Sequence, residues 1–150
     1  MTGGTRSLIQ LWTGVGLLQP SAESTEAGRG SRRRFPIEEV EIAALMVRLS
    51  LYGSTLRSLR IFEKKFRARA FGEKFARSPV RVLIRAARAG DLGVYIGFAR
   101  HDEKHAVVDI FRWDGTHPSL PEKIAGGPDM VLMRPAQAWR RIPRAGADQS

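Results

Sequence analysis

Residues 32–59 read RRRFPIEEVEIAALMVRLSLYGSTLRSL, and this stretch decides the fold of the helical part of the chain. Pro36 suits the first position of a helix, where no amide hydrogen is needed. Gly53 suits the left-handed residue that ends the helix near Tyr52. Acidic side chains in the first turns favour the positive end of the helix dipole, namely Glu38, Glu39 and Glu41. Apolar spacing predicts one buried stripe, made of Val40, Ala43, Ala44, Val47 and Leu51.

Two further amphipathic helices are predicted downstream. Ser54 or Thr55 caps the first of them, and Ser78-Pro79 is a restart signal for the second, which ends at Gly90. The apolar faces are Leu56, Leu59, Phe62 and Phe66 in one helix, and Val80, Leu83, Ile84 and Ala87 in the other.

A short helix is also predicted upstream, over Thr5–Thr13, with Thr5 as its N-cap and glycines after its last turn. Its apolar residues share one face, which leaves Arg6 and Gln10 on the outer face. Packing of the small helices against one another is expected to bury Leu8, Trp12, Leu17, Leu18, Val40, Ala44 and Leu56.

The apolar period changes after residue 90. Alternation over Leu92–Phe98 predicts a half-buried strand, a polar turn follows at 101–105, and Ala106–Trp113 is a second strand. Residues 115–128 are expected to be loop, Met130–Met133 a third short strand, and 134–150 a fraying end. The chain is therefore predicted to be α+β, with helices first and a small antiparallel sheet after them.

Charge divides the chain in the same way. The formal net charge is +10, from 25 Lys and Arg against 15 Asp and Glu. Residues 1–90 hold 17 of these cations and 7 of the anions, whereas 91–150 hold 8 of each. The first part is thus the expected binder of a polyanion. The absence of cysteine excludes disulfides, Cys-based zinc sites and thiol catalysis.

Several short motifs occur in the order found in one family of DNA-binding proteins. They are Gly16-Leu17-Leu18-Gln19-Pro20, then Arg33-Arg34-Phe35, then Glu38-Glu39-Val40, and the junction Leu49 to Gly53 followed by Thr55-Leu56 and Leu59. Together they make residues 2–62 resemble the MerR-type winged helix-turn-helix regulators. In that family a recognition helix, a wing hairpin and an acid-opened helix follow one another. The loop Ser21–Ser31 stands where the wing would be.

The resemblance implies a sequence-specific binder of double-stranded DNA, a transcriptional regulator that acts as a homodimer. The family's first helix has no counterpart before Thr2, so we expect either an N-terminally shortened member or a translation start further upstream. Its DNA-binding domain would span 1–70, with a connecting helix at 71–90, a β-rich region at 91–134 and a flexible tail at 135–150. The β-rich region is left open as a dimer, effector or protein-binding part. The expected DNA contacts are Thr5, Arg6, Gln10, Trp12, Arg29, Arg32, Arg33 and Arg34.

Two other functions remain open at this point. A small basic toxin-type ribonuclease would use His101, His105, Arg100 and Arg112 as acid–base and phosphate-stabilising groups. A passive basic protein associated with RNA or the ribosome would need no site at all. We favour a non-enzymatic protein with no cofactor and no metal, because the histidine spacing matches no closed zinc pattern. Met1–Gly14 is no signal peptide and no apolar run is long enough for a membrane, so the expected compartment is the cytoplasm.

Overall fold

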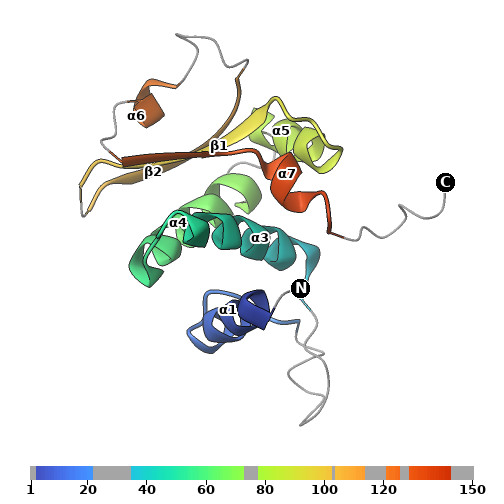
Figure 1. The fold of residues 1–150 in the computed structure, drawn as a ribbon. Helices are drawn as coiled ribbons and strands as arrows, with labels where there is room; N and C mark the ends of the chain where they lie inside the picture. The colour runs from blue at the N-terminus through green and yellow to red at the C-terminus, as the bar shows by residue number, and fades with distance from the viewer. Residues whose placement is uncertain are drawn as a thin grey trace, which may run out of the picture.

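The computed structural model describes residues 3–21, 35–72, 78–102, 104–113, 121–125 and 129–142. Within these ranges the chain forms helices and one three-stranded antiparallel sheet, which confirms the predicted α+β class (Figure 1). No described helix has the length and apolar character needed to cross a membrane. The elements are α1 (Gly3–Gly14), α3 (Ile37–Leu51), α4 (Leu56–Phe71), α5 (Pro79–Arg88), β1 (Val94–Arg100), β2 (Ala106–Arg112), α6 (Glu122–Ala125), β3 (Asp129–Met133) and α7 (Pro135–Trp139).

The elements stack in layers. In Figure 1 helix α1 lies at the bottom, α3 and α4 above it, the sheet above them, and α6 on the outer side of the sheet. The strand order is β2-β1-β3, with both pairs antiparallel. Helix α4 packs on β2, α3 on β3, and α5 and α7 pack together beside the sheet. Helix α3 thus lies between the α1 layer and the sheet.

The central strand β1 is buried on both faces, whereas the sequence predicted a half-buried strand. Ile96 and Phe98 enter the main core, and Tyr95 and Ala99 enter a second cluster together with Ile124 of α6. Gly97 allows α6 to approach, because a Cβ there would lie 3.0 Å from the Ile124 side chain. The prediction of loop throughout 115–128 is therefore wrong at α6, which covers the outer face of the sheet.

The buried surface of α3 differs from the predicted stripe. Leu51 is 77% exposed, and Val40, Ala44 and Val47 are only partly buried. The reason is that α3 packs against α1, α4, α7 and β3 at once, so more than one of its sides is covered. The core residues that α3 supplies are Ile42, Ala43, Leu45, Met46 and Leu49.

Most predicted helix ends are confirmed. The Thr55 Oγ1 accepts a hydrogen bond from the Ser58 amide at 3.2 Å, and Ser78 caps α5 in the same way. Gly53 and Gly90 follow their helices with φ of +78° and +98°. Two details are wrong: Pro36 is the N-cap of α3 rather than its first residue, and Thr5 lies inside α1, which begins at Gly3.

A buried ion pair joins α3 to α5. The Glu41 side chain is fully buried, and Arg88 donates to it from Nε at 3.0 and 3.1 Å and from Nη2 at 2.8 Å. This bidentate contact raises the pKa of the Arg88 guanidinium. The main-chain carbonyl of Glu41 also accepts a hydrogen bond from the Trp139 indole at 3.1 Å. Trp139 is 2% exposed, so the segment expected to be a flexible tail is structured as far as Ile142.

Arg88→Met leaves the buried Glu41 carboxylate without this cation. Breaking a buried pair from one side costs about 3–5 kcal/mol, so the free energy of unfolding in urea should fall by that amount. The exposed Arg85→Met on the same helix is the matched control and should change it by less than about 0.5 kcal/mol. The double variant Glu41→Leu/Arg88→Met should recover most of the loss. An equal loss of stability in Arg88→Met and Arg85→Met would contradict the assignment of a buried ion pair between Glu41 and Arg88.

Candidate nucleic-acid interface

Helix α1 lies at the surface, with two predicted base-reading residues on its outer side. Arg6 and Gln10 are both exposed, and their spacing of four places them on one face of the helix. Thr5 lies in the same helix, although its side chain is outside the described part. Leu11 is 51% exposed on the same surface. The side of α1 that faces outward is therefore the one predicted from the sequence.

The inner side of α1 is anchored by Trp12. Its side chain is 1% exposed, and the neighbouring core residues Leu17 and Leu18 are 3% and 2% exposed. The Trp12 carbonyl accepts hydrogen bonds from the amides of Leu17 at 2.8 Å and Leu18 at 3.3 Å, in a turn that Gly16 makes with φ of +80°. The expectation that Trp12 contacts DNA is wrong, since its ring belongs to the core.

Glu39 of α3 holds the turn that follows α1. Its Oε2 accepts a hydrogen bond from the Gln19 amide at 3.1 Å, and its carboxylate forms an ion pair with Arg67 of α4. Arg67 also donates from Nε to Glu63 at 2.7 Å. The hydrogen bond to Glu39 is the main cause of the raised pKa of Arg67. A single buried carboxylate thus fixes the end of α1 relative to both α3 and α4.

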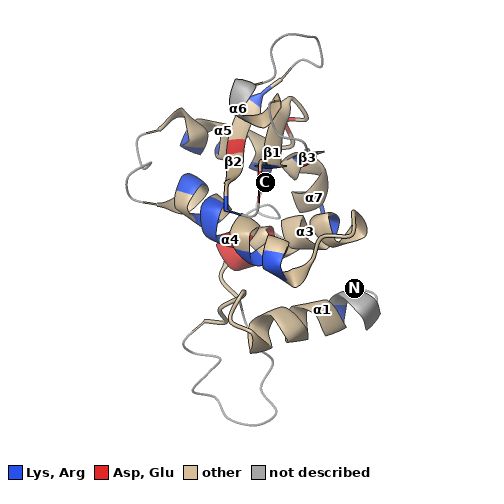
Figure 2. Ribbon diagram, turned by 90° about the vertical axis from the view of Figure 1, so that its left-hand side faces the viewer, with Lys and Arg blue, Asp and Glu red and all other residues tan. Residues whose placement is uncertain are grey.

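Three exposed cations follow one side of α4 at helical spacing: Arg57, Arg60 and Lys64, which we call the α4 stripe. Figure 2 shows Lys and Arg at successive turns of this helix. Arg60 donates from Nη2 to the Val15 carbonyl at 3.3 Å, so the stripe adjoins the end of α1. None of the three forms an ion pair within the described residues. These three residues are not among the contacts predicted from the sequence, although their helical spacing is a signal that could have identified them.

Two of the remaining cations of α4 differ from the stripe, because they are neutralised within the fold. Arg67 pairs with Glu39 and Glu63, and Arg69 pairs with Asp109 of β2 at 3.2 Å. The other predicted DNA contacts lie outside the described residues, and these are Arg29, Arg32, Arg33 and Arg34.

Of the residues proposed for a ribonuclease, Arg100, His101 and His105 lie at the β1–β2 turn, where Arg100 pairs with Ala106. Arg112 is not part of this group, because it pairs with Val94 at the other end of the hairpin, six strand residues or about 20 Å away. His105 Nδ1 lies 2.6 Å from Asp102, a contact that lowers the pKa of that carboxyl. Arg112 is held by Asp91 at 2.7 Å, which lowers the Asp91 pKa.

Arg100, the fourth member of that set, donates to Ser58 Oγ at 2.8 Å. Across the portion of the chain that the structure describes, no group of three or more His, Asp or Glu residues could hold a metal ion.

No protein-family model, no curated protein and no solved structure matches this sequence. The case for a function therefore depends on the geometry of the surface formed by α1 and the α4 stripe.

Trp12→Ala removes the anchor of α1 and should lower the free energy of unfolding by about 3–5 kcal/mol, the usual cost of emptying a buried tryptophan site. The adjacent Leu11→Ala is the matched control, because Leu11 is half exposed, and it should cost about 0.5 kcal/mol or less. Urea denaturation of both variants measures the difference. Similar losses of stability in Trp12→Ala and Leu11→Ala would contradict the orientation of α1 in which Trp12 is buried and Leu11 is half exposed.

Proposed function

We propose that this protein binds double-stranded DNA as a non-enzymatic transcriptional regulator, with α1 as its recognition helix. The observation that carries the proposal is the two-sided character of α1. Trp12 fixes the inner side in the core, while Arg6 and Gln10 stand exposed one turn apart on the outer side. A helix held rigidly from behind and polar in front is the arrangement that major-groove reading requires.

The dimensions and chemistry of α1 suit the major groove. Its 12 residues extend about 18 Å, and a groove about 12 Å wide admits one helix. The Arg guanidinium matches the acceptors of guanine, and the Gln amide matches the donor and acceptor of adenine. The α4 stripe would reach the phosphates beside the groove, since Arg60 already contacts the turn after α1.

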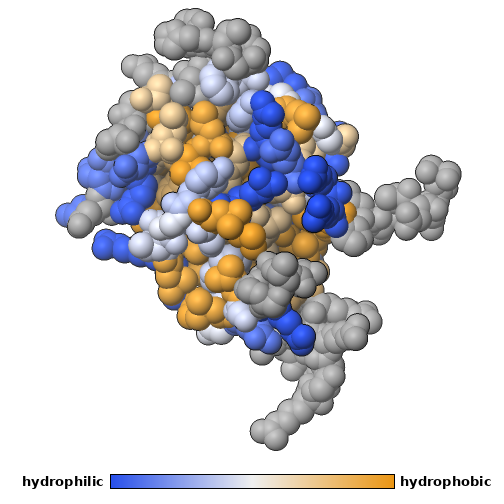
Figure 3. Space-filling view, in the orientation of Figure 1, coloured by the Kyte–Doolittle hydropathy of each residue, from blue (hydrophilic) through white to orange (hydrophobic). Residues whose placement is uncertain are grey.

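A homodimer is part of the proposal. Helix-turn-helix proteins commonly read two half-sites with two copies. The junction of α3 and α4 exposes apolar side chains that a second copy could cover, with Leu51 at 77%, Tyr52 at 67% and Leu56 at 38% exposure. Figure 3 shows apolar side chains at the surface over α1 and the α3–α4 layer. Contiguous apolar patches on a protein surface mark sites of association.

Arg6→Ala and Gln10→Ala should each weaken binding at a footprinted site by about 5- to 150-fold, because a good base contact is worth about 1–3 kcal/mol. The site is first located by footprinting the purified protein on the DNA upstream of its own gene. Arg85→Ala, an exposed arginine on α5, is the matched control and should leave affinity unchanged. Equal affinity of all three variants, or a preference for RNA, would contradict the proposal.

The double variant Arg57→Gln/Lys64→Gln should reduce the salt dependence of binding without changing the preferred sequence. Each lost phosphate contact lowers the slope of log K against log salt by about 0.9, so the slope should fall by about 2. Arg85→Gln/Arg140→Gln removes the same charge from α5 and the end of α7 and should leave the slope unchanged. Equal slopes in the two variants would indicate binding by overall charge alone.

A further inference from the structure

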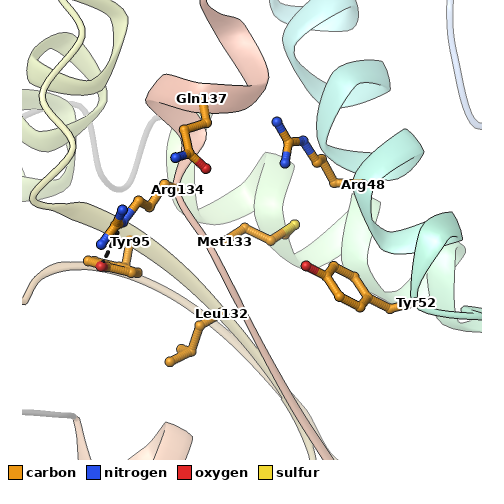
Figure 4. Close-up of a pocket in the computed structure, with 7 residues that line it drawn as sticks. All are labelled: Arg48, Tyr52, Tyr95, Leu132, Met133, Arg134 and Gln137. Atoms are coloured by element: carbon orange, nitrogen blue, oxygen red, sulfur yellow. Dashed lines mark hydrogen bonds between the residues drawn. The ribbon is translucent and has the colours of Figure 1, made fainter. Parts of the chain in front are cut away.

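A polar hollow of about 250 Å³ lies at the other end of α3, away from Glu39. It is formed where the last turn of α3 meets the sheet and α7 (Figure 4). The polar ends of Arg48, Tyr52 and Gln137 point toward the middle of the hollow, and Arg134 and Tyr95 lie together at one side. Leu132 and Met133 of β3 also line it, from opposite sides of that strand: Met133 lies toward Arg48 and Tyr52, and Leu132 lies on the side of Tyr95. No DNA contact proposed above is among these residues.

The hydrogen-bonding groups in the hollow are mainly donors. Arg134 donates from Nε to the Tyr95 hydroxyl at 2.7 Å, and its Cζ lies 5.1 Å from the centroid of the Tyr95 ring. Because that hydroxyl accepts this bond, its own hydrogen can be given to a ligand. The outer guanidinium nitrogens of Arg134 also remain to donate.

The charge of the hollow is positive and uncompensated. Among the described residues, its lining contains two arginines and no Asp or Glu. Neither Arg48 nor Arg134 forms an ion pair with any described residue, unlike Arg67, Arg69, Arg88 and Arg112. The Tyr52 hydroxyl likewise has no hydrogen-bond partner in the described ranges. Two guanidinium groups and two phenol hydroxyls line the hollow, Arg48 and Tyr52 at one side and Arg134 and Tyr95 at the other, and such donors are the ones that carboxylate and phosphate groups prefer.

The size of the hollow limits its ligand. Small-molecule sites usually enclose about 300–1,000 Å³, so this one lies just below the range and suits a compact molecule. The exposed Tyr52 ring and the Met133 side chain can cover a planar or apolar body, while the arginines hold the charge.

We propose that this hollow is a binding site for a small organic anion, a phosphate or carboxylate attached to a compact planar or apolar body. Arg48 and Arg134 bind the charged group, the tyrosine hydroxyls and Gln137 orient it, and Met133 contacts the body. The site is separate from the α1 surface, so its occupancy is measured on the protein without DNA.

Fluorotyrosine labelling gives a direct readout, because the chain has only 2 tyrosines and both line the hollow. Phenyl phosphate is the probe, with phenol and inorganic phosphate as controls for its two halves. We expect both fluorine NMR signals to shift saturably with phenyl phosphate, and at least 10-fold weaker binding of either control. Absence of a saturable shift, or equal binding of inorganic phosphate, would overturn the proposal.

Arg48→Gln and Arg134→Gln should each weaken phenyl phosphate binding by at least 10-fold, since hydrogen bonds to charged groups are worth about 1.5–3 kcal/mol. Arg85→Gln is the matched control and should bind as the unaltered protein does. Two dispersed fluorine signals in the free variants show that each is folded. Affinity in Arg48→Gln and Arg134→Gln equal to that in Arg85→Gln would overturn the assignment of these two arginines.

Discussion

Two carboxylates inside the protein fix the helices that surround α3. Glu39 and Glu41 are two residues apart, so their side chains leave α3 on nearly opposite sides. On one side Glu39 joins the turn after α1 to Arg67 of α4. On the other side Glu41 binds Arg88 of α5 with its carboxylate and Trp139 of α7 with its carbonyl. A buried carboxylate that loses its cation is costly, so these contacts permit few other arrangements of the helices.

The same ion pairs decide where positive charge remains available. Arg67, Arg69, Arg88 and Arg112 are neutralised by acidic groups of the fold, although all of them count toward the net charge of +10. Surface cations without such partners in the described ranges include the α4 stripe and also Arg85, Arg134 and Arg140 of other elements. The α4 stripe is the group that adjoins the end of α1, through Arg60 and the Val15 carbonyl. A polyanion that meets α1 would therefore meet this charge beside it.

Helix α3 also separates the two proposed sites. Its N-terminal half holds α1 through Glu39, and its last turn supplies Arg48 and Tyr52 to the hollow. The two sites share a rigid element but no residue. The ring of Tyr52 belongs both to the hollow and to the exposed apolar group at the α3–α4 junction. Binding of an anion and association of two copies would thus both involve this ring.

The sequence by itself determined the local features: the starts of α4 and α5, the glycines that follow α3 and α5, the turn at residues 101–105, and the outward position of Arg6 and Gln10. Caps, prolines, left-handed glycines and apolar periodicity act within a few residues, so they can be read without a partner. Only the tertiary structure decided which sides of α3 are buried, that β1 is covered on both faces, and that α7 docks through Trp139. It also paired each buried Glu with one Arg among many and brought α3, β3 and α7 together around the hollow. These features depend on residues up to 98 positions apart, as between Glu41 and Trp139, and helical or strand periodicity carries no information over such separations.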